Sequence, residues 1–343
     1  MKRLNLVILF FIFCAAIPND NEPKKIKSAA YWTSPIMSVE QAIALSVNKY
    51  DFVIADYENM FNNHGALDTL KKLSPNTKIL AYVNPTEIFA KQLPNRPLQN
   101  SLIERINQRY PAWLLRDKSG QSIVFYEGMK MMNISSVCPK INKRNYSEWL
   151  SDTLIHKVYS DPIWDGTFLD NNGKTVSWVN SSIDANSDWL PDSMAALDGW
   201  WEEGLRSFLK KIRSVKGKGF VIIGNKGSVD FTDLVDGRMF EFFPNDYLGG
   251  KKDGGWWQSM SNASQTGPFT IFMVKEKDLN FALASALLLD NVYIAVGQNN
   301  SRFYPQLQEK VAKGGDIKLQ RQLGDGKTIE VVPSQKSGVL INK

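Results

Sequence analysis

Histidine and cysteine are scarce in this chain of 343 residues, which has only two of each. So few zinc-binding and cluster-binding side chains argue against a zinc enzyme, an iron–sulfur protein and a disulfide scaffold. The charge is only mildly one-sided, since 41 basic and 35 acidic residues give a net charge of +6. The basic residues are spread along the chain, which argues against a nucleic-acid-binding surface. The sequence predicts no metal and no organic cofactor.

Apolar runs long enough to cross a membrane are also missing, because no segment reaches about 18 apolar residues. The first sixteen residues nevertheless have a pattern of their own. Two basic residues precede an apolar run over 6–13, and Cys14 and Ala16 form a small-residue pair before a cleavage point. This pattern predicts a signal peptide over 1–16 and a secreted or cell-surface protein. The alternative is a lipoprotein signal in which Cys14 becomes a lipid anchor.

No linker rich in Pro or Ser and no low-complexity tract divides residues 27–300. Eight short apolar runs rich in Val, Ile, Phe and Tyr recur there, with a length typical of strands buried on both faces. The eight runs are residues 27–33, 51–57, 78–84, 166–171, 220–225, 237–243, 269–275 and 292–298.

Helix-like stretches lie between these runs. Residues 38–50 open with Ser38 and have Gln41 three positions on, which is the spacing of a capping box. The pattern also predicts helices over 145–160, 194–219 and 279–290. Strands that alternate with helices in this way predict an α/β fold, a (β/α)8 TIM barrel.

The domain boundaries follow from this pattern. We expect the barrel to span residues 27–312, with a small hairpin over 113–128 in the long gap between the third and fourth strands. Residues 313–343 alternate in polarity around a Gly-Asp-Gly turn within 323–326. They predict a short β-rich extension that packs on the barrel.

Polar residues stand at the ends of several predicted strands, where barrels of this kind place their catalytic groups. A carboxylate embedded in apolar sequence is costly to bury unless it is paired or used. Glycoside hydrolysis requires two carboxyl groups at the same end of the barrel, one protonated and one ionised. We therefore predict Asp170 and Glu241 as the catalytic pair. The predicted substrate-binding residues at other strand ends are Asp56, Asn84, Asn171 and Asn225.

Each of these residues also has a structural alternative. Asp170 could cap the turn over 171–173, and Glu241 could pair with Arg238 or Lys226. Asn84 and Asn225 could be turn residues, since a proline and a glycine follow them closely. The sequence leaves these alternatives open.

Ten tryptophans are many for this length. Flat aromatic faces complement the apolar faces of sugar rings, and Trp256 and Trp257 lie in a glycine-rich segment after Glu241. We predict both as substrate platforms, and core packing is the alternative. Residues 184–192 begin like a calcium loop but lack its glycine and its final glutamate, so we predict no metal there.

Several segments together resemble a known family. They are DGTFLDNN (165–172), IIGN (222–225), GRMFEFF (237–243), FALASALLLDNVYIAVGQN (281–299), RFYPQL (302–307) and LQRQLGDGKTIEVVP (319–333). They are similar to the hypothetical glycoside hydrolase family 15, whose members are barrel proteins inferred to act on carbohydrates. Polygalactosaminidase-type barrels share the first motif. The resemblance implies a (β/α)8 glycosidase fold. It also implies that Asp170 and Glu241 match the acidic residues that the family has at its strand ends. The chain departs from the pattern at Asp290 and Asn291.

The function that we expect is an exported glycoside hydrolase that cleaves a polysaccharide or glycoconjugate. The alternative is a catalytically silent barrel that binds glycans at the cell surface. A barrel that is only an envelope scaffold is a third, more distant interpretation. The position of Asp170 relative to Glu241 separates the first two, because only the enzyme needs both carboxylates in one pocket.

Overall fold

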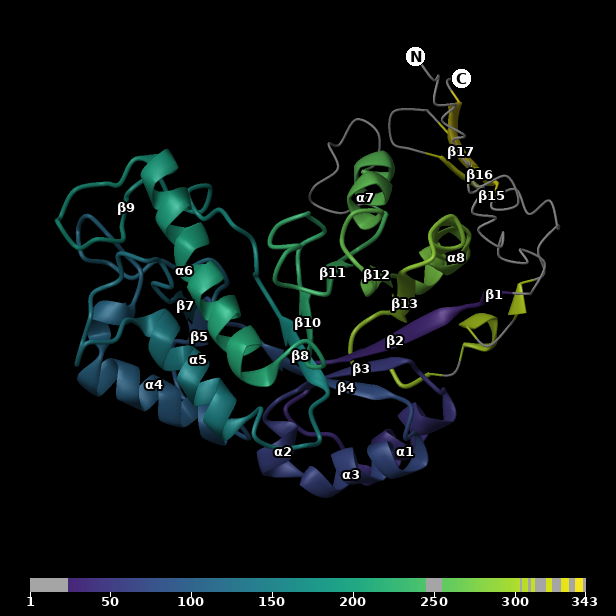
Figure 1. Cartoon of the computed structure of the whole chain (residues 1–343), viewed down its shortest axis with the longest axis horizontal. Coiled ribbons are helices and arrows are strands. Elements are labelled where there is room, and N and C mark those ends of the chain that lie inside the picture. The colour runs from purple at the N-terminus through teal and green to yellow at the C-terminus, as the bar shows by residue number, and fades with distance from the viewer. Residues whose placement is uncertain are drawn as a thin grey trace, which may run out of the picture.

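The computed structural model describes residues 24–244, 255–302, 304–307, 310–311, 319–322, 328–332 and 337–341. Its centre is a closed barrel of eight parallel strands, surrounded by helices (Figure 1). All eight predicted runs form these strands, so the predicted (β/α)8 barrel is confirmed. The barrel strands are β2 (Lys27–Trp32), β3 (Phe52–Asp56), β4 (Lys78–Val83), β8 (Gly166–Leu169), β10 (Val221–Gly224), β11 (Gly237–Phe240), β12 (Thr270–Val274) and β13 (Val292–Val296).

The strands follow one another around the barrel in chain order, and β13 closes it against β2. Their register keeps the carboxyl ends close together. Asp56 at the end of β3 lies beside Tyr82 of β4, which in turn lies beside Phe168 of β8. The residues that follow the strands therefore meet at one rim of the barrel, which is where the predicted site residues lie.

The barrel interior is filled with side chains that form their own hydrophobic cluster. Large aromatic residues from different strands contact edge to face, as Phe52 does with Tyr293 at 4.9 Å between ring centroids. Each fully buried residue of this size contributes roughly 1.5–3 kcal/mol of transfer free energy. The interior is therefore a packed core, and ligand access is confined to its ends.

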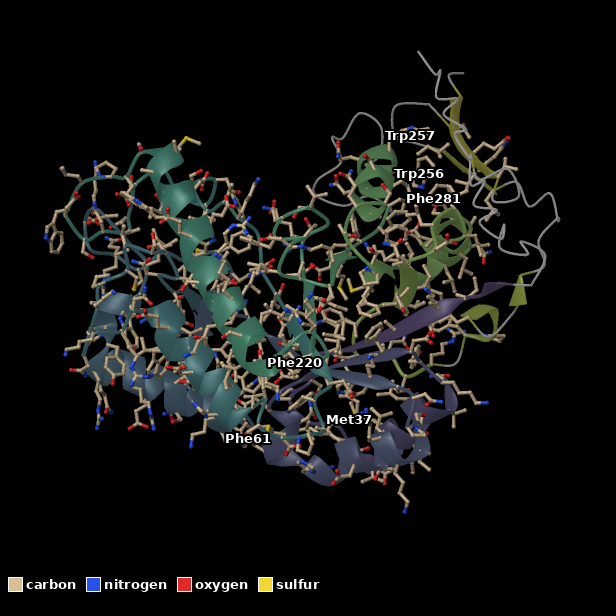
Figure 2. All side chains as sticks on the ribbon, viewed as in Figure 1. Met37, Phe61, Phe220, Trp256, Trp257 and Phe281 are labelled. Carbon is tan, nitrogen blue, oxygen red and sulfur yellow. The ribbon has the colours of Figure 1, made fainter. Side chains whose placement is uncertain are left out.

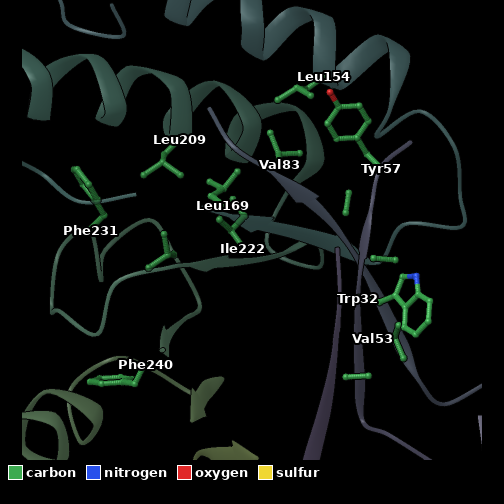
Figure 3. Packing of buried hydrophobic residues seen from close by; sticks show 14 of the residues in the cluster. Trp32, Val53, Tyr57, Val83, Leu154, Leu169, Leu209, Ile222, Phe231 and Phe240 are labelled. Carbon is green, nitrogen blue, oxygen red and sulfur yellow. The ribbon is translucent and has the colours of Figure 1, made fainter. Parts of the chain in front are cut away.

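A second, larger core lies between the barrel and its helices, and Figure 3 shows part of it. Residues on the outer face of the strands, such as Val53 and Ile222, meet apolar stripes of the helices. The helices are α1 (Val39–Val47), α2 (Asn59–Asn62), α3 (His64–Leu73), α4 (Pro97–Arg109), α5 (Tyr146–Lys157), α6 (Met194–Lys216), α7 (Trp256–Ala263) and α8 (Leu279–Ala286). No helix in the described part of the chain is long and apolar enough to cross a membrane.

Local sequence signals set the ends of several helices. Ser38 caps α1 and forms the predicted capping box with Gln41. Asn145 does the same for α5 with Glu148. Helix α6 ends at Lys216 and is capped by Gly217, whose φ of 73° lies in the left-handed region that favours glycine. These caps satisfy backbone groups that the helices leave unpaired.

The long segment between β4 and β8 contains a small hairpin within 113–128, as predicted: Arg116 bridges Ser122 in antiparallel fashion, and the backbone N–H of Ile123 donates to the carbonyl of Leu115 at 2.9 Å. Its short strand β6 (Arg116–Asp117) pairs with the distant β9 (Ile183–Asp184). The segment's own turn is held by the Asp117 side chain, which accepts from the backbone N–H groups of Ser119 and Gln121. Two further short strands, β5 (Glu87–Phe89) and β7 (Met129–Met131), pair with each other.

The C-terminal extension forms a three-stranded antiparallel sheet of β15 (Leu319–Gln322), β16 (Thr328–Val332) and β17 (Ser337–Ile341). It lies near α8 in Figure 1, and Ile329 and Val331 are buried in the core shared with the barrel helices. A two-stranded sheet joins β1 (Lys24–Lys25) to β14 (Lys310–Val311). The predicted signal peptide over 1–16 and the Gly-Asp-Gly turn lie outside the described residues.

Candidate active site

Two predicted acids and one predicted amide meet at the carboxyl rim of the barrel. Asp170 follows β8, Asn225 follows β10 and Glu241 follows β11. The Nδ2 of Asn225 donates to Oδ1 of Asp170 at 2.7 Å and lies 3.1 Å from Oε2 of Glu241. The two carboxylates thus share one hydrogen-bond donor, although they come from different strands.

Asp170 is held by three hydrogen bonds. Besides Asn225, the hydroxyl of Tyr82 donates to Oδ2 at 2.5 Å, and the backbone N–H of Asn171 donates to Oδ1 at 2.8 Å. Burial raises the pKa of Tyr82 well above its usual value, and the nearby charge of Asp170 raises it further. The phenol therefore keeps its proton and acts as a donor. Three donors to one carboxylate fix its orientation at the rim.

Aromatic side chains form the floor beneath these acids. The ring of Tyr31 meets that of Phe168 at 5.4 Å, and the ring of Tyr82 stacks on Phe168 at 5.9 Å. Burial raises the pKa of Tyr31 well above its usual value, and the charges of Asp170 and Glu241 add to the shift. The Tyr31 hydroxyl is therefore protonated and lies within the electrostatic reach of both acids.

Glu87 is a third acid at this rim, and the sequence analysis missed it. Its Oε2 accepts from the side-chain amides of Asn84 at 3.1 Å and Asn171 at 2.6 Å. Burial raises its pKa, and the charge of Asp170 acts in the same direction. Asn84 and Asn171 are thus joined to the site through Glu87. The Asn-x-x-Glu spacing of residues 84 and 87, just after a strand, is the signal that could have found it.

Asp56 is buried beside Tyr82 and is bound by a positive charge. Arg96 donates to its Oδ2, and the backbone N–H of Glu58 donates to its Oδ1 at 2.9 Å. Its pKa is nevertheless raised, because burial outweighs the attraction of Arg96. Asp56 therefore lies next to the acid pair as a buried, already paired group.

Arg238, on β11, fixes the loops that carry the site. It is fully buried and donates to the backbone carbonyls of Asn172, Asn225 and Asp230. Burial lowers its pKa to about 10. A Cβ at Gly224 would lie 2.5 Å from Nη1 of Arg238, so only glycine allows the guanidinium to approach there. The sequence left open an Arg238–Glu241 ion pair, and the hydrogen bonds described for the guanidinium go to these backbone carbonyls.

The two predicted tryptophan platforms have different positions. Trp256 is 1% exposed, and its Nε1 donates to Ser285 in the core between α7 and α8. Trp257 is 37% exposed and packs edge to face on Trp256. Figure 2 labels the two residues next to each other on α7. Trp256 therefore differs from the expectation, because its buried ring offers no face to a sugar. Trp257 presents part of its ring to solvent.

Two other sequence features are explained by local structure. Cys138 is buried, which raises its pKa to about 12 and keeps the thiol protonated. In the loop that begins like a calcium site, both oxygens of Asp184 accept from backbone N–H groups of Asp188 and Trp189. Within the described residues, no group of three or more His, Cys, Asp or Glu side chains is arranged to hold a metal ion.

The fold and the site define a (β/α)8 barrel with acidic groups gathered at its carboxyl rim, the end where barrel enzymes have their active sites. The model of the hypothetical glycosyl hydrolase family 15 matches residues 71–325 of the sequence. The chain belongs to this family. Membership supports a hydrolase that acts on glycosidic bonds and has a carbohydrate substrate. No functionally curated protein matches the sequence.

Solved glycosidases are similar in fold at very low sequence identity. A maltogenic α-amylase, AmyB from Thermotoga neapolitana, is 10% identical with a TM-score of 0.46, and the match covers 90% of this chain and 86% of that one. An α-N-acetylgalactosaminidase, NagBb from Bifidobacterium bifidum, is 8% identical with a TM-score of 0.47. That match covers 94% of this chain but only 58% of NagBb.

Proposed function

We propose that the protein is an exported glycoside hydrolase that cleaves a polysaccharide or glycoconjugate with Asp170 and Glu241. The observation that carries the proposal is the position of Asn225, whose single amide nitrogen lies within hydrogen-bond distance of both carboxylates. Family membership supports the same chemistry. Export rests on the sequence pattern of residues 1–16 alone.

The contacts of Asp170 support a role for it as the nucleophile, with Glu241 as the acid and base. Asp170 accepts three hydrogen bonds, which suits an ionised nucleophile that attacks the anomeric carbon. Glu241 then gives its proton to the departing glycosidic oxygen. In the second step Glu241 takes a proton from water, and that water releases the sugar from Asp170. No other group is needed to balance either step.

The spacing of the carboxylates favours retention of configuration. Two oxygens that both lie close to one nitrogen, at 2.7 and 3.1 Å, can be no further apart than the sum of those distances. This limit applies to the two facing oxygens, and it allows the roughly 5–5.5 Å between the carboxyl groups of retaining glycosidases. We therefore propose a double displacement through a glycosyl–enzyme intermediate.

The polar groups around the pair are suited to bind sugar hydroxyls. Tyr31 presents a protonated phenol, and Asn84 and Asn171 present amides that Glu87 orients. In the silent-barrel alternative these groups would bind a glycan, but the barrel would have no need of two carboxylates joined through Asn225. The shared donor therefore favours the enzyme.

Hydrolysis by the whole chain tests the proposal. Reducing-end release is measured over a panel of polysaccharides with wild type, Asp170→Asn and Glu241→Gln. Asp68→Asn, an exposed carboxylate on α3, serves as the matched control. We expect both site variants to lose at least about a thousandfold in kcat while they stay folded by circular dichroism. Activity that survives in either variant would overturn the site, and glycan binding without cleavage by wild type would favour the silent barrel.

A further inference from the structure

A hollow of about 550 Å³ lies on the outside of the barrel, between helices α4 and α5. Phe61 of α2 lines one part of it, and its label in Figure 2 lies near the ends of both helices. This volume is within the range of sites that bind small molecules. None of the carboxylates of the candidate active site lines it.

One wall of the hollow is a cluster of aromatic rings. Trp113 is 1% exposed and is fixed by its Nε1, which donates to the carbonyl of Pro139 at 2.9 Å. Tyr110 stacks on it with ring centroids 4.3 Å apart, and Trp149 is tilted against it at 5.3 Å. Tyr110 and Trp149 are only half-buried. They therefore offer apolar ring surface on a rigid base, which suits a sugar ring.

The charges around the hollow are mainly positive. The cationic side chains that line it include Arg105, Arg144 and Lys157, and Asp152 is its only acid. Asp152 is already paired, with Arg144 at 3.3 Å and with Lys211 at 3.2 Å. Arg105 and Lys157 are exposed, and neither forms an ion pair within the part of the chain that the structure describes. The hollow thus has two cations available for a ligand.

Neutral hydrogen-bonding groups complete the lining. Ser101 and Asn142 contribute a hydroxyl and an amide, and Thr153 contributes a second hydroxyl whose proton goes to the carbonyl of Trp149. Aromatic faces, hydroxyls, an amide and two uncommitted cations together match a sugar that carries hydroxyls and a carboxylate. An apolar helix would leave the cations without partners, and a neutral sugar would not use them.

We propose that this hollow is a second saccharide-binding site, specific for acidic oligosaccharides that contain uronic acids. A sugar ring packs against Trp149 and Tyr110, and its carboxylate pairs with Arg105 or Lys157. Such a site would hold an acidic polymer on the protein away from the barrel rim. The proposal does not depend on the hydrolysis proposed above, because it concerns binding alone.

Calorimetric titration of the whole chain tests this site with defined probes. They are oligosaccharides of galacturonic acid, of mannuronic and guluronic acid and of hyaluronan, with maltohexaose as the neutral sugar and hexaglutamate as the acidic peptide. We expect at least one acidic oligosaccharide to bind, more weakly as salt increases. The double variant Arg105→Glu/Lys157→Glu is expected to weaken that binding by about tenfold or more.

Two sets of variants keep the test specific. Lys210→Glu/Lys218→Glu makes the same change in net charge at exposed positions of α6 and the loop that follows it, and should leave binding unchanged. Asp170→Asn should also bind normally if the acidic sugar lies in the hollow. Trp149→Phe should weaken binding while keeping an aromatic ring in the core.

Three results would overturn the proposal. One is that no acidic oligosaccharide binds. Another is that binding survives the double charge reversal, or is lost in Asp170→Asn, which would place the ligand at the barrel rim. The third is that hexaglutamate binds as well as the sugars and depends on the same two cations, which would identify an acidic peptide as the ligand.

Discussion

The side-chain nitrogen of Asn225 determines how the two acids are placed, because it lies between Asp170 and Glu241. We expect Asn225→Ala to lower kcat/KM by about a hundredfold or more, since a preorganised donor to the reacting groups is lost. Reducing-end assays on the substrate found for wild type would measure this. Asn186→Ala, in an exposed loop, is the control. An Asn225→Ala enzyme with wild-type activity would mean that the bridge has no role in catalysis.

The phenol of Tyr82 makes a second prediction possible. Tyr82→Phe removes the hydrogen bond to Asp170 and should lower kcat by about tenfold to a hundredfold, because the ionised nucleophile loses a donor. Tyr159→Phe is a matched control, since its buried hydroxyl bonds Thr167 at 2.9 Å away from the rim. Both variants should lose about 1 kcal/mol of unfolding free energy. Equal activities of the two variants would contradict the role given to Tyr82.

The sequence predicted the central residues of the site but not their neighbours. Asp170, Asn225 and Glu241 could be found because each follows an apolar run, and parallel strands end at one rim. Tyr82 could not, because within its strand an aromatic residue is typical of core packing. Glu87 begins the short strand β5, which is placed by its pairing with β7, far along the chain. The burial of Trp256 likewise depends on α8, which sequence spacing does not place against α7.

At the scale of elements, the first turn of helix α4 is bound by a buried carboxylate, that of Glu58. Glu58 accepts from the backbone N–H groups of Leu98 and Gln99 at 3.2 and 2.7 Å. Burial nevertheless raises its pKa to about 7, and the nearby charge of Asp56 also acts upward. The first turn of α4 and the loop that carries Arg96 are therefore tied to a titratable group beside the site.

This gives a pH dependence of stability. The pKa of Glu58 is about 7 in the folded chain against 4.5 as its ordinary value, so the folded state holds the proton more tightly. The resulting stability is complete below pH 4.5 and is lost as the pH rises through about 7. We expect the unfolding free energy of wild type relative to Glu58→Gln to fall by up to about 3 kcal/mol over this window, at about 1.4 kcal/mol per pKa unit.

Urea unfolding at several pH values measures this difference. Exposed Glu104→Gln on α4 is the control and should follow wild type. A wild-type to Glu58→Gln difference that stays constant from pH 4.5 to pH 8 would show that Glu58 has the same proton affinity in the folded and unfolded chains.

The elements that the sequence predicted are those with local signals. Capping residues and apolar periodicity placed α1, α5 and α6 close to their observed bounds. The segment between β4 and β8 was harder, since its strands are short and β6 pairs with β9, more than sixty residues away in sequence. Such pairing is decided by tertiary packing and leaves no short-range pattern.

At the scale of the whole molecule, the C-terminal sheet shares its core with the barrel. Ile329 of β16 is fully buried in that core. Ile329→Ala should therefore lower the unfolding free energy by about 2–5 kcal/mol in a single transition of the whole chain. Gln320→Ala, exposed on the neighbouring strand β15, should change it by less than about 0.5 kcal/mol.

Denaturant unfolding followed by tryptophan fluorescence measures this effect. All ten tryptophans lie in the barrel part of the chain, so the signal reports on the barrel. If Ile329→Ala left the main transition in place and created a separate early one, the sheet would be an independent unit. The chain would then have two domains where the structure has a common core.

The configuration of the first-formed sugar tests the central claim most directly, because it depends on how close Asp170 and Glu241 lie. Proton NMR of the anomeric signal during the first minutes of hydrolysis reads it before mutarotation mixes the anomers. The geometry around Asn225 predicts a product with the same anomeric configuration as the substrate. A product of inverted configuration would require space for a water between the carboxylates, and would contradict the nucleophilic role of Asp170.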